Sequence, residues 1–267
     1  AKVDLSEADL MCGSHPLSHE PTVEAMRQRG ETVTPNRHNC SGKHTGMLAQ
    51  ALLYGEPKED YINPQHPVQQ RILRAFSEIT GVPLEEITLG IDGCSAPVFA
   101  IPMRAAARAF ALLADPSSLP EPRRSALRLI FKAMTSNPDM VSGPDTFDTD
   151  LMTAARGAIL TKGGAEGYQA IAVLPGARGE GSTALGITIK ISDGDLAQRD
   201  RLVPFPHIAH DGGGRARSTA AVETLRQLGA LDASQLESLH AYFPRPQYNW
   251  RHFEVGGIEP VFDLRVK

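Results

Sequence analysis

Hydrophobic residues recur at helical spacing in several segments, and prolines, serines or glycines mark many of their ends. After His66-Pro67, for example, the residues Ile72, Phe76 and Ile79 lie on one helical face until Gly81 ends the run. A serine at position 218 and a glycine at position 229 bound another such segment. The pattern therefore predicts helices over Thr22–Arg29, Lys43–Leu53, 67–80, Pro102–Ala114, Arg123–Met134, Leu151–Arg156 and 218–228.

Strand patterns are clearest in the second half of the chain. Tyr168–Leu174 is largely apolar, and Ala184–Ile191 alternates apolar and other residues strictly. The link GARGEGS between them predicts a hairpin, a shorter apolar run covers Ile87–Ile91, and the segment EPVFDLRVK at 259–267 predicts a last strand. Helices followed by strands indicate an α/β (α+β) fold with a mixed, largely antiparallel sheet flanked by helices. We expect one domain over residues 1–267, with the proline-rich loop at Pro116–Pro122 as an alternative boundary.

Composition narrows the class of protein. Of the 267 residues, 41% are hydrophobic and 22% are charged, which is ordinary for a globular chain with a large core. The formal net charge of −4 excludes the basic face that a nucleic-acid backbone requires. No apolar run approaches the roughly 20 residues of a membrane span, and no signal-peptide pattern is visible. We therefore expect a cytoplasmic protein without membrane or nucleic-acid partners.

The chain contains three cysteines, Cys12, Cys40 and Cys94. An odd, sparse count is typical of a reducing compartment, where thiols serve metal binding or chemistry. The alternative is that these thiols are small buried hydrophobes. Cys40 and Cys94 lie in glycine-containing polar segments, which favours a chemical role for these two.

The segment HNCSGKH at 38–44 carries two imidazoles, a thiol, a hydroxyl and an amine into the start of a helix. A helix N-terminus lowers a thiol pKa and attracts anions, and Lys43 beside Cys40 favours a thiolate. The pattern of a phosphate-binding P-loop is absent. The alternative is a simple helix cap by Asn39 or Ser41.

The segment GIDGCSAP at 90–97 follows an apolar run and places a carboxylate, Asp92, beside the thiol of Cys94. Loops after strands often carry functional groups. If Cys40 and Cys94 approach each other in the fold, two thiolates and one more donor would form an open zinc site. The alternative is that Asp92-Gly93 is a plain turn.

The segment TKGGAEG at 161–167 combines Lys162 with glycines that let a substrate approach the backbone closely. A lysine beside glycine on an edge strand also occurs in serine β-lactamases and penicillin-binding proteins, so a penicillin-interacting enzyme is one hypothesis. The alternative is a glycine turn with a solvated lysine. A loop serine such as Ser14 is most often a cap.

Taken together, the motifs NCSGKH at 39–44, HPVQ at 66–69, GIDGCSAP at 90–97, MVSG at 140–143 and KGGAEG at 162–167 resemble those of the rhizobial-type L-asparaginases. The resemblance covers nearly the whole chain. It implies a fold similar to serine β-lactamases and glutaminases, hydrolysis of L-asparagine to L-aspartate and ammonia, and a homodimer. It also implies a zinc-capable trio of Cys40, Lys43 and Cys94, with zinc modulatory rather than essential. Lysine binds a metal only when neutral, so the resemblance implies a lowered pKa for Lys43.

The resemblance also assigns the remaining site residues. Substrate contacts fall on His44, Asp92 and Gly93, with the charge of Asp92 suited to the α-amino group of the substrate. Lys162 matches the lysine of a Ser–Lys catalytic pair, in which a neutral lysine takes the serine proton. No serine here has lysine three positions on, and Ser14-His15 is followed by Pro16-Leu17, unlike the family's second serine motif. We expect both catalytic serines to fall upstream of Ala1, so that an N-terminal segment is missing. The alternative function is a fragment or impaired relative that binds zinc or a small amino acid without turnover.

Overall fold

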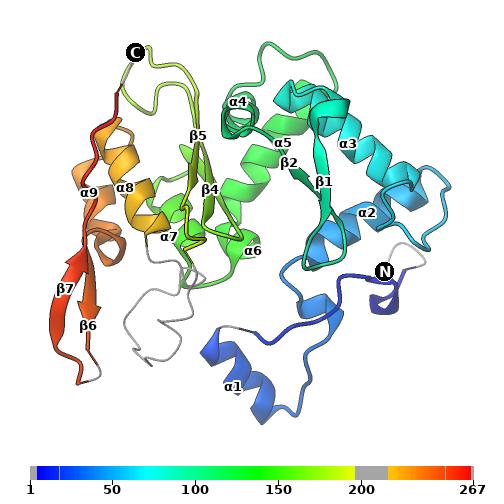
Figure 1. Ribbon diagram of the computed structural model, residues 1–267, viewed down its shortest axis with the longest axis horizontal. Coiled ribbons are helices and arrows are strands. Elements are labelled where there is room, and N and C mark those ends of the chain that lie inside the picture. The colour runs from blue at the N-terminus through cyan, green and yellow to red at the C-terminus, as the bar shows by residue number, and fades with distance from the viewer. Residues whose placement is uncertain (1–4, 18, 196–215, 250, 266–267) are drawn as a thin grey trace. The chain divides into compact units, whose positions relative to one another are not determined.

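A computed structural model describes residues 5–17, 19–195, 216–249 and 251–265 (Figure 1). The chain divides into two compact units, Ala1–Ala105 and Ala106–Lys267, with the division near the start of helix α4. The predicted class is confirmed, because helices combine with strands that pair only antiparallel among the described residues. These strands form three separate small sheets, of two, three and two strands. Among the described residues, no helix has the length and apolar character needed to cross a membrane.

The first unit is a set of helices with one β-hairpin. His66 caps helix α3 by accepting a hydrogen bond from the Val68 backbone N–H, and Gly81 ends the helix in the left-handed conformation, as the sequence predicts. The rings of Phe76 on α3 and Phe99 on β2 lie 4.6 Å apart and join helix to hairpin. The elements are α1 (Glu20–Gln28), α2 (Ser41–Leu53), α3 (Pro67–Thr80), β1 (Thr88–Ile91) and β2 (Pro97–Ala100), with 3-10 helices at Glu7–Asp9, Pro35–Arg37 and Leu84–Glu86.

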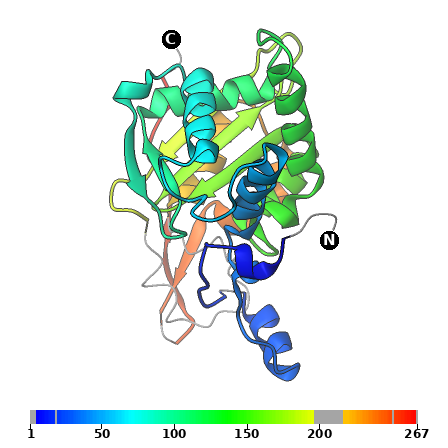
Figure 2. The same cartoon turned by 90° about the vertical axis from the view of Figure 1, so that its right-hand side faces the viewer.

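The second unit has the three-stranded sheet β3-β4-β5 at its centre. Figure 1 shows this sheet between α8 on one side and α5 and α6 on the other, and Figure 2 turns the strands toward the viewer. Helix α4 begins at the division and continues into this unit. The elements are α4 (Met103–Ala114), α5 (Arg123–Ser136), α6 (Pro138–Ser142), α7 (Phe147–Ala154), β3 (Ile159–Gly164), β4 (Tyr168–Val173), β5 (Leu185–Lys190), α8 (Arg217–Gln227), α9 (Ala233–Ser238), a 3-10 helix at His240–Tyr242, β6 (Arg245–Tyr248) and β7 (Glu254–Ile258).

Alternation along the strands gives the sheet two apolar faces. On one face, Ile171 packs in a core with Leu225 of α8, and on the other, Ala172 packs in a core with Phe131 of α5. At Gly186 the backbone of α4 lies directly on β5, because a Cβ there would come within 1.8 Å of Ala107 O. Only glycine permits this approach.

Two expectations at the ends of elements are wrong. Helix α8 is capped at Ala216 rather than at Ser218, which is fully buried inside its first turn. The carboxylate of Asp195 accepts the N–H groups of Ala216 at 2.8 Å and Arg217 at 3.0 Å, so a distant side chain caps this helix. Residues 259–265 form no strand; Pro260 interrupts that run, and β7 lies just before it.

Candidate active site

The loop between β1 and β2 is organised by the side chain of Asp92. Its Oδ1 accepts the backbone N–H groups of Cys94 at 2.9 Å and Ala96 at 3.1 Å. The Asp92 N–H in turn donates to Ala96 O at 3.0 Å. Gly93 is exposed, and a Cβ there would meet nothing within 4 Å. The loop is therefore the predicted turn, but it also fixes a carboxylate at the end of β1.

Lys43 extends from the first turn of α2 to this carboxylate. Its Nζ donates to Asp92 Oδ2 at 2.7 Å, and the two side chains are 40% and 25% exposed. Burial lowers the pKa of Lys43, but hydrogen bonds with Asp92 and Cys94 outweigh burial and raise it. With these partners the lysine is an ammonium ion at neutral pH.

The pKa values of Asp92 and Cys94 shift in opposite directions. Burial raises the pKa of Asp92, but hydrogen bonds from Cys94 and Lys43 outweigh burial and bring it to about 2. Burial and the hydrogen bond to Asp92 raise the pKa of Cys94 to about 11. At neutral pH the carboxyl is ionised and the thiol keeps its proton. An ionised carboxylate only accepts hydrogen bonds, and Asp92 accepts one from the backbone N–H of Cys94.

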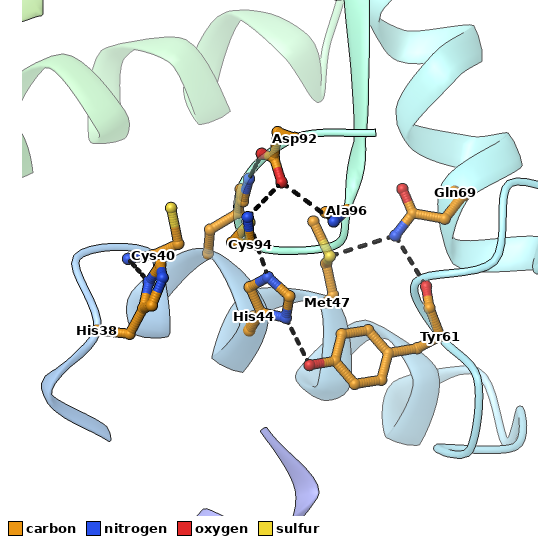
Figure 3. A network of polar contacts seen from close by, with 10 residues as sticks. His38, Cys40, His44, Met47, Tyr61, Gln69, Asp92, Cys94 and Ala96 are labelled. Atoms are coloured by element: carbon orange, nitrogen blue, oxygen red, sulfur yellow. Dashed lines mark hydrogen bonds and ion pairs between the residues drawn. The ribbon is translucent and has the colours of Figure 1, made fainter. Parts of the chain in front are cut away.

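His44, a predicted substrate contact, is fully buried on α2. Figure 3 shows its ring between Tyr61 and Cys94: Nδ1 lies 2.6 Å from Tyr61 Oη, and Nε2 lies 3.1 Å from Cys94 Sγ. Burial, together with the charge of Lys43, lowers the pKa of His44 and favours the neutral ring. His44 thus contacts Asp92 through Cys94 rather than lying on the exposed side of the loop.

Two supporting residues were not identified as site residues from the sequence. Gln69 is buried, and its Nε2 donates to Tyr61 O at 2.8 Å and to Met47 Sδ at 3.2 Å (Figure 3). Gln69 is the last residue of the HPVQ motif, so this motif had marked the position without indicating its contacts. Tyr61 lies in no motif, and no local pattern would have identified it.

Cys40 is the N-cap residue of α2 and is half-buried. Its backbone N–H donates to Nδ1 of His38 at 2.9 Å, and the ring of His38 lies edge-on to that of His15, with centroids 4.5 Å apart. Burial, with the charge of His15, lowers the pKa of His38. The proposed cap by Asn39 or Ser41 is not found, since Cys40 holds the cap position without a side-chain hydrogen bond.

The chemistry of Cys40, Lys43 and Cys94 fits zinc. Two thiols and an amine are donors that zinc accepts, and both Cys94 and Cys40 lie close enough to Lys43 to affect its pKa. Within the described ranges, no group of three or more His, Cys, Asp or Glu side chains is arranged to hold a metal ion. To bind a metal, the Lys43 amine would have to lose its proton and its contact with Asp92.

Lys162 belongs to the second unit and lies within β3, an edge strand of its sheet. Its side chain is exposed, and Nζ donates to Gly163 O at 2.7 Å. Ile159 and Leu160 pack in the cores of opposite faces, so Lys162 shares the face of Leu160. The backbone at Lys162 is therefore that of a regular strand and not that of a glycine turn.

A buried polar cluster contacts the residues on both sides of Lys162, the backbone of Gly163 and the side chain of Thr161. Asp148 Oδ2 on α7 accepts the Gly163 N–H at 2.6 Å, and Oδ1 accepts Gln169 Nε2 at 2.6 Å. The Thr161 hydroxyl lies 3.4 Å from Asp148 Oδ1. Among the described residues, Gln169 Oε1 has no hydrogen-bond partner. Asp148 is 4% exposed, and its hydrogen bond with Gly163 links α7 to β3 next to Lys162.

The first unit brings together Asp92, Gly93, Cys94 and three residues of α2 and its cap, which are Cys40, Lys43 and His44. Lys162 lies in the second unit. Residues 1–204 match a family model described as L-asparaginase II. A comparison with curated proteins found no match.

Proposed function

The chain belongs to the L-asparaginase II family, and on this basis we propose that it hydrolyses the side-chain amide of L-asparagine to L-aspartate and ammonia. The observation that carries the proposal is the ionised Asp92. Its pKa of about 2 keeps it negative at neutral pH, and it is partly open to solvent. A carboxylate oxygen accepts more than one hydrogen bond, so Asp92 can accept the α-ammonium group of an amino acid beside Lys43.

In this proposal Lys162 is the proton acceptor of a Ser–Lys centre. The neutral amine takes the proton of a serine hydroxyl as its oxygen attacks the amide carbon, and returns that proton to the departing nitrogen. Ammonia leaves, water hydrolyses the acyl ester, and L-aspartate is released. The regular backbone of β3 and its contacts with Asp148 support the assignment, since a proton acceptor must be held in position.

Release of ammonia from L-asparagine tests the activity. The full-length protein should release it, and Lys162→Ala in that protein should lower kcat by at least about 100-fold. Lys132→Ala, on an exposed position of α5, is the matched control and should keep full activity. L-Glutamine should react at least about 10-fold more slowly, because its extra methylene has to fit a pocket sized for asparagine. Full activity in Lys162→Ala would refute its role. Binding of L-aspartate without any turnover of L-asparagine would refute the hydrolase and favour a binding protein.

We also propose that Cys40, Lys43 and Cys94 bind zinc, which would act as a Lewis acid near the substrate or as a structural clamp when present. The residues would supply two thiolates and a neutral amine. Equilibrium dialysis should detect zinc on the wild-type protein and a loss of it in Cys40→Ser. Cys12→Ser is the control, because Cys12 is equally a cysteine of this unit but donates to Gly13 O and Pro35 O instead. Equal zinc binding by Cys40→Ser and the wild type would contradict the site.

A further inference from the structure

A chain of buried hydrogen bonds leads from Tyr61 to Asp92 (Figure 3). Tyr61 and His44 are fully buried, and Cys94 is 2% exposed. Tyr61 Oη lies 2.6 Å from His44 Nδ1, His44 Nε2 lies 3.1 Å from Cys94 Sγ, and the backbone N–H of Cys94 donates to Asp92 Oδ1 at 2.9 Å. In the proposed function Asp92 binds the substrate and Cys94 is a zinc ligand, whereas Tyr61 and His44 have no role in it.

The hydrogen-bond directions in this chain follow from its two ends. At one end the backbone N–H of Met11 donates to Tyr61 Oη at 2.9 Å. A backbone N–H can only donate, so the tyrosine oxygen accepts there. The hydroxyl hydrogen of a fully buried tyrosine needs an acceptor of its own, and His44 Nδ1 is the ring atom within reach. Nδ1 is therefore the unprotonated nitrogen of the ring.

A neutral imidazole with unprotonated Nδ1 carries its hydrogen on Nε2. That hydrogen points to Cys94 Sγ, so the sulfur accepts from His44, and the backbone N–H of the same residue donates to Asp92 Oδ1. The Asp92 carboxylate therefore accepts at the far end. Every donor in the chain thus points the same way, from Met11 through Tyr61, His44 and Cys94 to the carboxylate.

We infer that Tyr61 is a positioning residue: its hydroxyl fixes the tautomer of His44, and through Cys94 it orients the carboxylate that binds the amino group of the substrate. The inference rests on the proposed function for the role of Asp92, but not for the tautomer of His44. The packing agrees with it, because Gln69 holds the Tyr61 backbone at 2.8 Å and the rings of Tyr61 and His44 meet edge-on with centroids 5.5 Å apart. Such outer partners commonly set the tautomer and orientation of a functional ring.

Tyr61→Phe removes one oxygen atom and keeps the ring. Nitrogen-15 NMR of the imidazoles at neutral pH reports the tautomer directly, with His44 assigned by its absence in His44→Gln. The wild type should show His44 with hydrogen on Nε2 only. Tyr61→Phe should shift the His44 signals toward the other tautomer or toward exchange between the two. Hydrogen on Nδ1 in the wild type, or unchanged His44 signals in Tyr61→Phe, would overturn the inference.

Affinity for L-aspartate, the product of the proposed reaction, tests the second step and needs no turnover. Tyr61→Phe should raise the Kd measured by calorimetry by about 10-fold. Tyr242→Phe is the matched control, since this tyrosine is also buried and donates to Asp150 at 2.6 Å in the second unit. It should lose similar stability but keep the His44 tautomer and the Kd. A changed tautomer with unchanged Kd would refute the link to Asp92. Absence of L-aspartate binding in the wild type would count against the proposed function, and the NMR result would still decide the tautomer.

Discussion

The two groups of candidate residues are held in different ways. In the first unit the functional residues bind one another: Lys43 pairs with Asp92, His44 contacts the Cys94 thiol, and the Cys94 backbone N–H donates to Asp92. In the second unit the Lys162 side chain is exposed, and Asp148 holds the strand backbone next to it. A network of side chains sets protonation and proton direction, whereas a clamp on the backbone sets position only. Substitutions in the first unit should therefore change pKa values and binding, and those in the second should change stability and kcat.

The largest effect should come from Asp148→Leu in the second unit. This change leaves the Gly163 N–H and the Gln169 amide without their acceptor. Each buried unsatisfied group costs about 1–3 kcal/mol, so we expect a loss of about 3 kcal/mol in the free energy of unfolding, measured in urea. Without this contact β3 would move and displace Lys162. A displacement of about 1 Å is enough to lower kcat for L-asparagine by about 100-fold.

Asp150→Leu tests whether Asp148 affects kcat through the position of β3 or only through the stability of the protein. Asp150 is on the same helix, and within the described part of the chain its side chain accepts the Tyr242 hydroxyl at 2.6 Å rather than a group of β3. It should lower stability as well and leave kcat nearly unchanged. Equal losses of kcat in the two variants would show that Asp148 acts on stability alone. Asp148→Asn should cost less than Asp148→Leu, because the unpartnered Gln169 Oε1 can accept from the new amide.

Local patterns in the sequence account for most helices and for the hairpin. Helix α3 is bounded by His66-Pro67 and Gly81, and β5 alternates strictly, so both are predicted with their ends. Strand β3 was not predicted as a strand, because its second half is TKGG, which reads as a turn. The close contact of Gly186 with Ala107 depends on a helix far away in sequence and has no local pattern.

For the same reason, the sequence predicts the residues of the candidate site but not their contacts. The motifs identify Cys40, Lys43, Asp92 and Cys94, and the structure brings the Lys43 amine to Asp92 at 2.7 Å. What the sequence could not provide is the partner of each group, because partners come from distant segments. The structure adds that hydrogen bonds with Asp92 and Cys94 outweigh burial and raise the pKa of Lys43. The lowered pKa that the resemblance implies concerns a lysine bound to zinc and stays a prediction.

A smaller loss of stability is expected when the pH is lowered, and it comes from Asp92 in the first unit. The pKa of Asp92 falls from 3.8 to about 2 on folding. A depressed carboxyl pKa gives stability that is complete above about pH 4 and is lost as the pH falls through about 2. The contribution is at most about 2 kcal/mol, since the side chain is 25% exposed. Urea unfolding between these pH values should show a smaller acid loss for Asp92→Asn than for the wild type. Parallel curves for the two proteins would contradict the assignment.

The smallest effect on stability should come from Lys43→Met. In the Lys43–Asp92 ion pair the N···O distance is 2.7 Å, and the two side chains are 40% and 25% exposed. In the Lys58–Asp9 pair of the same unit the distance is also 2.7 Å, and the side chains are 37% and 16% exposed. Ion pairs with this exposure contribute about 0–1 kcal/mol, so Lys43→Met and its matched control Lys58→Met should both change the free energy of unfolding by less than about 1 kcal/mol. Calorimetry should nevertheless show a changed Kd for L-aspartate in Lys43→Met only, because only this lysine contacts the proposed binding carboxylate. The same Kd in both variants would mean that the network around Asp92 is structural, and the contrast between the two units would then no longer hold.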